Sequence, residues 1–392
     1  MLTTIMLEYS IPKRAKAIVF KKSGSIETEI IDVEVPQPGP GEILVRITHT
    51  GVCHTDYSLA TNSLGHVKTA ERQIGGHEGV GVVVKLGTGV TGRQLGDRVG
   101  IKWIASCCMS CDMCLHGFDS KCAKRKVSGF GHPGTFQQYL VTDAWYATPI
   151  PDNVDSAKAA PLLCGGITVF VALQRACLRP GQWVAISGAG GGLGSLAVQY
   201  AKAMAFQVLA IDHTSKAKFC KDIGADAFLD FTKFDDASLI EETKSLTDGG
   251  AHAILVSNSS IKSYDQSLDL VRYGGTLVCI GLPEGSSAPI AGAIPSKMIM
   301  NRLTIKGKVP TPSRLVLLES SVSVGLTKLF AGTMVGNRRD AVDCLHPLTK
   351  GQIDPQVTVR PMDSLTQVSI FDPSLVLISI SSSNANFRFL RR

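Results

Sequence analysis

The sequence lacks any apolar run long enough to cross a bilayer. No uninterrupted apolar stretch reaches the roughly 18 to 20 residues that a membrane span needs, so we expect no membrane partner. The first residues also lack the continuous apolar core and cleavage site of a secretory signal, because Glu8, Pro12 and Lys13 interrupt them. These absences predict a cytoplasmic protein.

Blocks of like charge are missing as well. The net charge is +7, but Lys and Arg are spread along the chain, and its tight basic clusters, 124–126 and 391–392, are too short for a nucleic-acid-binding arm. We therefore expect no nucleic-acid partner. The 44% of hydrophobic and 19% of charged residues are ordinary for a globular protein, and 392 residues suffice for two domains with separate cores.

The character of the sequence changes near residue 160. Before that point, short β-like runs such as 43–49 and 79–86 are separated by Gly and Pro, which predicts a mostly β domain. After it, apolar strands alternate with helical stretches, as at 183–187 and 193–205, which is typical of a parallel sheet with crossover helices. The predicted fold class is α/β, with a mostly β domain followed by a parallel-sheet domain.

Eleven cysteines need an explanation other than disulfides, which a reducing cytosol disfavours. Four of them, Cys108, Cys111, Cys114 and Cys122, follow the pattern C-x2-C-x2-C-x7-C. Thiolates two residues apart on a tight loop can converge on one ion, and four of them complete the tetrahedral shell of a structural zinc site. A chance cluster of buried cysteines and an iron–sulfur site are the alternatives. We favour zinc, and we expect Cys107 not to be a ligand because neighbouring side chains point apart.

A second, dispersed set consists of Cys53, His77 and Cys164. Taken singly, each is better explained as a small buried thiol or a core histidine. Taken together, they match a catalytic zinc, which uses three protein ligands from distant loops and leaves a fourth position for water or substrate. The Cys2His set of alcohol dehydrogenase is the known case of this pattern.

A glycine-rich loop at 187–194 follows an apolar strand and precedes a helix. Glycines there allow a tight turn and a close approach of the backbone to a pyrophosphate at the helix N-terminus. Asp212 ends the next strand, where an acid binds the ribose hydroxyls of NAD and repels the phosphate of NADP; its alternative is a helix N-cap. The loop residues predicted to bind the cofactor are Gly188, Gly190, Gly191, Gly192, Leu193 and Gly194.

Taken in order, GVCHTD, GGHEGVGVVVKLG, GDRVGIKW, the four-cysteine loop, PLLCGGITV and VAISGAGGGLGSLAVQYAKAM resemble the zinc-containing medium-chain alcohol dehydrogenases of the tetrameric yeast and fungal type. The resemblance runs from about Lys16 to Gly307. It implies a homotetramer, a GroES-like catalytic domain and a Rossmann domain that binds NAD. The implied ranges are 15–160 for the catalytic domain with its zinc loop at 107–122, 161–306 for the Rossmann domain and 307–392 for an atypical segment that partly returns to the catalytic domain.

The resemblance also implies roles around the catalytic zinc. Glu78 lies beside the metal together with the three ligands, Asp56 orients His77, and the Thr55 hydroxyl binds the alcohol. The implied reaction is the reversible oxidation of primary or secondary alcohols to aldehydes or ketones with NAD, by an enzyme with two Zn2+ ions per chain. In close relatives a histidine continues the proton relay, whereas this chain has Ser58, so we expect the proton to pass through Ser58 and water.

Further roles concern the cofactor and the substrate pocket. By resemblance, His54 lies near the cofactor pyrophosphate, and Lys216 or Lys218 holds the ribose. Trp103 matches one pocket tryptophan, but Leu64 stands where the ethanol-active yeast type has another. The smaller side chain predicts a preference for alcohols larger than ethanol.

The C-terminal part departs from the family. About 25 residues without a pattern separate Gly307 from a segment that resumes the family pattern at 334–345, and a serine-rich tail replaces the closing helix and strand and the arginine that contacts the cofactor. We interpret 308–332 and 368–392 as translated intron sequence. If the chain is translated as written, the alternative function is a zinc- and dinucleotide-binding protein with impaired catalysis.

Overall fold

The computed structural model describes residues 9–63, 68–283, 289–291, 293–307, 335–366 and 378–381. The chain divides into two compact units. The first contains the described residues up to Ile167 and those from Asn337 onward, and the second runs from Thr168 to Gly336. The division falls inside helix α4 (Gly165–Ala176), a few residues beyond the expected boundary at 160.

The first unit is built on a seven-stranded sheet of order β10-β5-β4-β3-β18-β17, with β9 also paired to β3. Alternate residues of β3, Ile43, Val45 and Ile47, are buried in one cluster, whereas Leu44 is buried in a second cluster on the opposite face of the strand. A two-stranded and a three-stranded sheet complete the unit. Its strands are β1 (Arg14–Phe20), β2 (Thr28–Glu34), β3 (Glu42–Val52), β4 (Gly79–Leu86), β5 (Arg98–Ile101), β6 (Ile104–Ser106), β7 (Lys126–Ser128), β8 (Gly131–His132), β9 (Tyr139–Asp143), β10 (Thr148–Pro149), β17 (Thr358–Pro361) and β18 (Ile378–Ser381).

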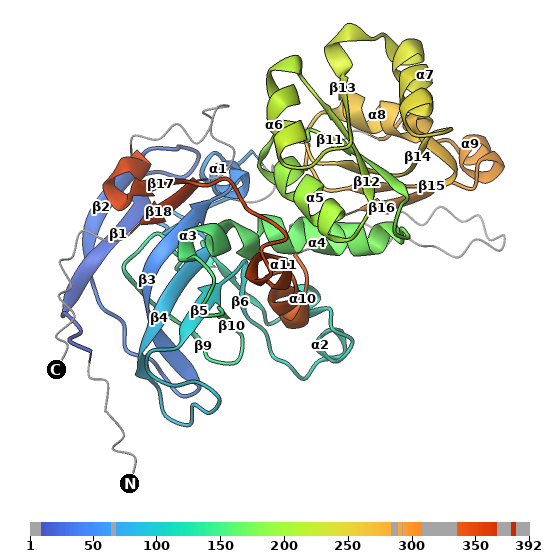
Figure 1. Cartoon of the computed structure of the whole chain (residues 1–392). Coiled ribbons are helices and arrows are strands. Elements are labelled where there is room, and N and C mark those ends of the chain that lie inside the picture. The colour runs from blue at the N-terminus through green and yellow to red at the C-terminus, as the bar shows by residue number, and fades with distance from the viewer. Residues whose placement is uncertain are drawn as a thin grey trace. The chain divides into compact units, whose positions relative to one another are not determined.

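The helices of this unit are short and lie in the connections between its strands (Figure 1). They are α1 (His54–Ala60), α2 (Asp112–Leu115), η1 (Asp119–Lys121), α3 (Ser156–Ala159), η2 (Ala160–Leu163), α10 (Arg338–Asp343), α11 (His346–Thr349) and η5 (Met362–Thr366). In the described part of the chain no single helix is long and apolar enough to span a membrane. The helices at 156–163 and α4 meet that criterion only as a pair, with a 55° bend between them.

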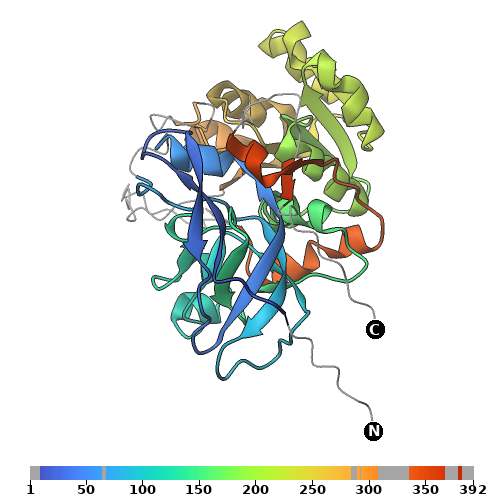
Figure 2. The same ribbon diagram turned by 90° about the vertical axis from the view of Figure 1, so that its left-hand side faces the viewer.

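The serine-rich tail contributes a strand to the main sheet. We expected this tail to leave the sheet without its closing strand, and that expectation was wrong: β18 pairs antiparallel with β3 and parallel with β17. The reason is the burial of Ile380, which is 2% exposed and packs against Ile18 and Phe136. Figure 2 shows the last described elements beside the first strands of the chain. The stretch 308–332 and the remainder of the tail lie outside the described residues.

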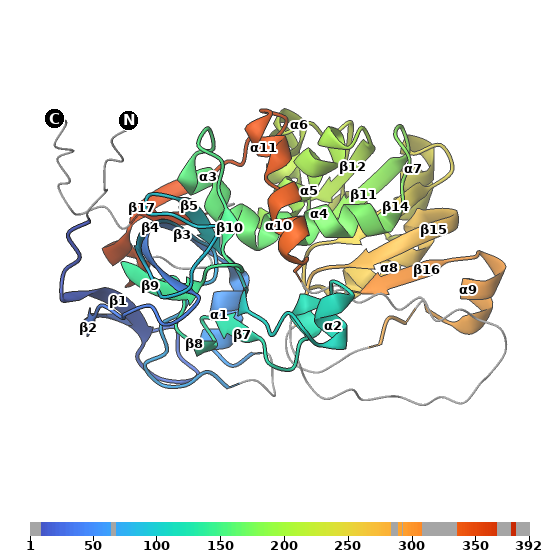
Figure 3. The same cartoon turned by 90° about the horizontal axis from the view of Figure 1, so that it is seen from below.

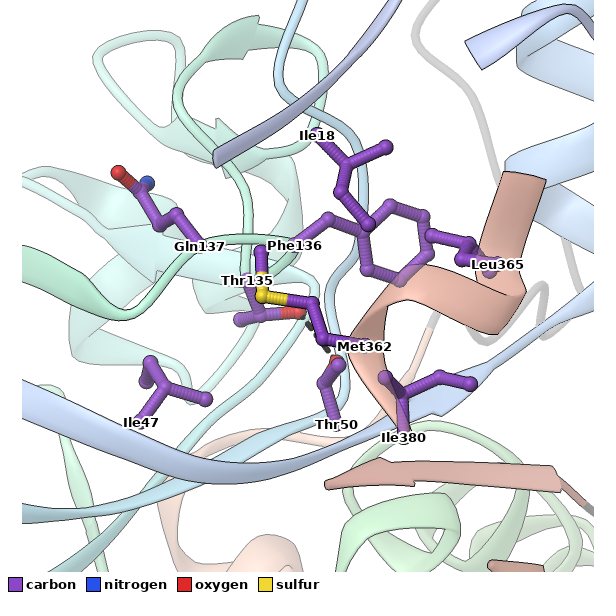
Figure 4. Close-up of a pocket in the computed structure, with 9 residues that line it drawn as sticks. All are labelled: Ile18, Ile47, Thr50, Thr135, Phe136, Gln137, Met362, Leu365 and Ile380. Atoms are coloured by element: carbon purple, nitrogen blue, oxygen red, sulfur yellow. Dashed lines mark hydrogen bonds between the residues drawn. The ribbon is translucent and has the colours of Figure 1, made fainter. Parts of the chain in front are cut away.

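A small cavity remains where these segments meet (Figure 4). It measures about 10 Å3 and is lined by Met362, Leu365 and Ile380 together with residues of the N-terminal half. Thr50 and Thr135 also line this cavity, and their hydroxyls share a hydrogen bond of 2.7 Å. Met362, Leu365 and Ile380 therefore pack against the core around a gap of about the size of one water molecule.

The second unit is a six-stranded parallel sheet of order β13-β12-β11-β14-β15-β16. The order reverses between β11 and β14, as in a doubly wound dinucleotide-binding fold. Helices α5 and α6 cover one face and α7 and α8 the other (Figure 1). The expected fold class is confirmed. The elements are β11 (Trp183–Ser187), α5 (Gly192–Ala203), β12 (Gln207–Asp212), η3 (Thr214–Lys216), α6 (Ala217–Asp222), β13 (Ala227–Asp230), η4 (Phe231–Lys233), α7 (Asp236–Leu246), β14 (Ala251–Val256), α8 (Ile261–Leu270), β15 (Val271–Cys279), α9 (Pro295–Met300) and β16 (Thr304–Gly307).

Candidate metal centres and cofactor loop

Cys53, His77, Glu78 and Cys164 come together in the first unit. Their candidate ligand atoms all lie within 4.8 Å of one another. Cys53 caps the N-terminus of α1 directly after β3, His77 and Glu78 precede β4, and Cys164 occupies the bend before α4. The sheet and the bend thus bring residues from three distant parts of the sequence to one point.

Asp56 organises this cluster. Its Oδ2 accepts a hydrogen bond from the Cys53 N–H at 3.0 Å, and its Oδ1 accepts one from the Gly76 N–H at 3.2 Å. The same Oδ1 lies 3.0 Å from Nδ1 of His77, and both side chains are buried. A carboxylate at this distance keeps the proton on Nδ1 and leaves Nε2 as the electron-pair donor.

The remaining chemistry of the cluster fits a zinc ion. Nε2 of His77 is buried and has no hydrogen-bond partner among the described residues. This nitrogen can therefore donate its electron pair to a metal ion. Hydrogen bonding with the Cys164 thiol lowers the pKa of Cys53, against the effect of burial. Two thiolates and a neutral imidazole form a donor set typical of zinc. Burial raises the pKa of Glu78, so its carboxyl needs a cation nearby to ionise.

The predicted catalytic and pocket residues lie around this cluster. The Trp103 ring packs edge-on against His77 with centroids 5.1 Å apart, which places it at the predicted metal site. The Thr55 N–H donates to Sγ of Cys53 at 3.5 Å. The buried Ser58 hydroxyl donates to the His54 carbonyl at 3.2 Å, so in this arrangement it serves the helix backbone. The centroid of the His54 ring lies 5.6 Å from the centroid of the Tyr57 ring.

Leu64, the other predicted pocket residue, lies outside the described residues.

The four-cysteine loop also closes on itself. Cys108, Cys111, Cys114 and Cys122 place their sulfurs within 4.8 Å of one another. Pairs among them lie 3.5, 3.6 and 4.0 Å apart, close to the sulfur–sulfur spacing of about 3.8 Å that a tetrahedral shell with Zn–S bonds of ≈ 2.3 Å requires. Backbone N–H groups of Ser110 and Cys111 lower the pKa of Cys108 to about 6. The four sulfurs are therefore spaced to share one ion.

A polar cluster that no sequence motif indicated lies behind this loop. Lys102 is 3% exposed, donates to the Thr148 hydroxyl at 3.2 Å and to the Tyr146 carbonyl, and lies 4.1 Å from the centre of the Tyr146 ring. The Tyr146 hydroxyl donates to Oδ2 of Asp119 at 3.2 Å, and Nε of Arg338 lies 3.4 Å from the same oxygen. Burial lowers the pKa of Lys102 to about 7. These residues are far apart in sequence, so only the fold brings them together.

The glycine-rich loop of the second unit connects β11 to α5. Gly188 has φ +79°, a left-handed conformation that favours glycine, and a Cβ on Gly194 would come within 2.0 Å of the Gly188 carbonyl oxygen. Gly190 follows in the turn, Gly191 caps α5 without a side-chain hydrogen bond, and Gly192 and Leu193 begin the helix. The backbone amides of the first turn are thus available to an anionic group.

Asp212 is part of this loop's structure. Its Oδ2 accepts a hydrogen bond from the Gly190 N–H at 2.8 Å, and its Oδ1 accepts one from the His213 N–H at 2.7 Å. The helix-cap alternative is wrong, because His213 is the residue that caps η3. The two candidate lysines differ: the stem of Lys216 packs against Gly190, whereas Lys218 is 87% exposed and pairs with Asp222 at 2.6 Å. Lys216 therefore fits the ribose-binding prediction better.

The known proteins that are similar to this chain are alcohol dehydrogenases and zinc-binding dehydrogenases. Two family models match: an alcohol dehydrogenase GroES-like domain over residues 39–152 and a zinc-binding dehydrogenase domain over 192–310. The chain is 42% identical to alcohol dehydrogenase 2 of Emericella nidulans over 91% of this chain and 94% of that protein. It is 40% identical to an alcohol dehydrogenase of Schizosaccharomyces pombe over 92% of this chain and 94% of that protein. The cobalt- and zinc-bound thermostable alcohol dehydrogenase of Pyrobaculum aerophilum has a TM-score of 0.75 and 26% identity, covering 94% of this chain and 99% of that one.

Proposed function

The chain belongs to the zinc-binding alcohol dehydrogenases, and from this premise we propose that it interconverts primary or secondary alcohols and their aldehydes or ketones with NAD, using two zinc ions per chain. One observation carries the proposal. The Asp56 carboxylate holds Nδ1 of His77, which leaves a buried, unpartnered Nε2 beside the thiols of Cys53 and Cys164.

Each group in this cluster has a defined task. A zinc ion held by Cys53, His77 and Cys164 supplies a Lewis acid that lowers the pKa of a substrate hydroxyl. Asp56 keeps the His77 ring in one tautomer and one orientation. We assign the Thr55 hydroxyl to hydrogen-bond the substrate oxygen and to accept its proton, and Ser58, one turn further along α1, to pass that proton to water.

The second unit supplies the site for the dinucleotide. NAD provides the hydride acceptor, and the chain supplies binding and orientation. The amides at the start of α5 would hold the pyrophosphate, and the Asp212 carboxylate would accept the ribose hydroxyls and repel a phosphate at that position. Asp212 is the basis for proposing NAD over NADP.

For the substrate, we propose alcohols larger than ethanol, because Leu64 replaces one of two pocket tryptophans. The other, Trp103, packs on His77. A series of primary alcohols of increasing chain length tests this proposal: kcat/KM should rise beyond ethanol. A maximum at ethanol would refute it.

The alternative function, a zinc- and dinucleotide-binding protein without turnover, drew its support from the aberrant tail. The pairing of β18 in the main sheet weakens that support, because the tail completes the sheet.

One experiment separates the two functions. The purified full chain is tested for NAD and NADP reduction with the alcohol series, and zinc is measured on the same sample. The proposal expects two zinc ions per chain and turnover with NAD. Full zinc content and NAD binding without turnover would favour the alternative.

A homotetramer, also proposed, is tested by light scattering.

A further inference from the structure

We propose that the structural zinc loop binds a second thiophilic divalent ion, held by Cys107, Cys114 and Asp119, with Cys114 bridging the two metals. The inference rests on the proposed function in one respect, since it takes the four-cysteine site to be filled by zinc. The three side chains place a thiol, a thiol and a carboxylate oxygen within 4.8 Å of one another. All three are buried, at 8%, 8% and 3% exposure.

The spacing suits one ion. Zn–S bonds of ≈ 2.3 Å and Zn–O bonds of ≈ 2.0–2.2 Å place two sulfurs of a tetrahedral shell about 3.8 Å apart and a sulfur and an oxygen about 3.6 Å apart. The candidate atoms lie within 4.8 Å of one another, so a contraction of at most about 1 Å brings them to that spacing. Water would complete a shell of three protein ligands.

Cys107 is separate from the first metal group. It is not a member of the set formed by Cys108, Cys111, Cys114 and Cys122, whose sulfurs converge on their own point. Cys114 belongs to both groups and is the thiol that both ions would share. The fifth thiol therefore adds a site and does not compete for the first one.

The carboxylate of Asp119 is held ready for this role. The Tyr146 hydroxyl at 3.2 Å and Nε of Arg338 at 3.4 Å both approach Oδ2, so these contacts do not occupy Oδ1. Arg338 is itself fixed at the start of α10, with Nη1 3.1 Å from Sδ of Met109 in the zinc loop. Figure 3 shows α10 beside the segment that carries α2. Such outer contacts orient a metal-binding carboxylate.

An open pocket provides an entry path. It has a volume of about 390 Å3, and both Cys114 and Asp119 line it. A metal site needs suitable ligands, supporting outer contacts and a route for the ion, and all three are present here. Two sulfur ligands among three select a soft or borderline ion such as Zn2+ or Cd2+ over Mg2+ or Ca2+.

Cadmium is the probe. The zinc-loaded full chain is equilibrated with excess Cd2+, freed of unbound metal by gel filtration, and analysed for total metal. We expect three ions per wild-type chain and two in Cys107→Ser. In Asp119→Asn, which loses a charged ligand, binding of the third ion should weaken by at least the roughly tenfold that loss of an outer partner costs. Cys177→Ser, which removes an exposed cysteine of the other unit, is the matched control and should keep three.

The outcomes are decisive in both directions. Wild type that stops at two ions, or Cys107→Ser that still binds three, overturns the proposal. Cadmium NMR of protein reconstituted with cadmium-113 in every site tests the bridge: scalar coupling between two cadmium resonances supports a shared Cys114 thiolate, and its absence overturns the bridged arrangement. A wild-type chain with fewer than two zinc ions before cadmium is added contradicts the proposed function. Cys107→Ser that keeps two zinc ions and full turnover while losing the third metal shows that the two proposals stand separately.

Discussion

The Oδ1 atom of Asp56 lies 3.0 Å from Nδ1 of His77, and the two side chains are 1% and 0% exposed. Buried polar groups are costly unless they are satisfied, and this carboxylate satisfies three donors at once: the His77 ring and the backbone N–H groups of Cys53 and Gly76. The pair thus links the cap of α1, the loop before β4 and the orientation of a predicted zinc ligand.

Replacing Asp56 by Asn should impair the catalytic metal site. One amide oxygen cannot accept from all three donors, and the amide N–H groups would oppose at least one of them. We expect zinc affinity or kcat/KM to fall about 10- to 100-fold, measured by chelator competition and by turnover. Asp152→Asn, an exposed position, is the control. Unchanged affinity and activity in the Asp56 variant would contradict the role we assign to it.

Replacing Asp212 by Ser should shift the choice of cofactor. The carboxylate accepts from the Gly190 N–H, and its charge would repel the phosphate of NADP. We expect the ratio of kcat/KM for NADP to that for NAD to rise at least about tenfold, which corresponds to about 1.4 kcal/mol. Kinetics with both cofactors check this, with Asp222→Asn as control. A ratio that stays at the wild-type value would rule out charge repulsion by Asp212.

Stability should depend on pH through Lys102. Burial lowers its pKa from 10.5 to about 7, opposed by Asp119, Cys107 and Asp143 and assisted by Arg338. Between these two pH values the unfolded chain holds more protons than the folded one, so the free energy of unfolding rises with pH in that window.

The Lys102→Met variant lacks this pH-dependent contribution to the free energy of unfolding. The difference in unfolding free energy between wild type and variant should grow in favour of the wild type from about pH 7 towards about pH 10, as measured by urea titration at fixed zinc content. Parallel pH profiles of the two proteins would show that Lys102 keeps an ordinary pKa.

Loss of one thiol from the four-cysteine loop should lower the stability of the protein, whereas the turnover of each correctly folded chain should change less. A structural zinc site supplies folding energy directly, and Sγ of Cys111 lies 3.6 Å from that of Cys114. We expect Cys111→Ser to lower bound zinc from two ions to one and to lower the melting temperature, whereas Cys177→Ser changes neither. A variant that still holds two zinc ions would argue against the assigned ligand set.

The tail strand should be needed for stability. Ile380 is 2% exposed in a cluster with Ile18 and Phe136. Its replacement by Ala removes buried methyl groups beside an existing cavity and should cost about 2–5 kcal/mol, measured by denaturant unfolding. Val359→Ala on the neighbouring strand β17 is the control, since Val359 is 49% exposed and should change stability by less than about 0.5 kcal/mol. Equal effects of the two substitutions would mean that β18 does not pack as described.

Local patterns were the predictable part of this protein. The four-cysteine loop and the glycine-rich turn are each contained in a short segment, so their spacing alone indicates which atoms converge. The contact of Asp119 with Arg338 joins residues more than two hundred positions apart, and no local pattern predicts such a pair. Strand β18 escaped prediction because four residues of Ile and Ser are too short to distinguish from a loop by periodicity alone.

The position of β18 between β3 and β17 has a consequence for how the protein is made. The second unit is one continuous stretch of chain, so it can fold as soon as it leaves the ribosome. The main sheet of the first unit cannot be completed until residues 378–381 are synthesised, because the 49–52 end of β3 pairs with a strand more than three hundred positions away. Pairing at such a separation is slow, and during that delay the edge of β3 is open to other chains.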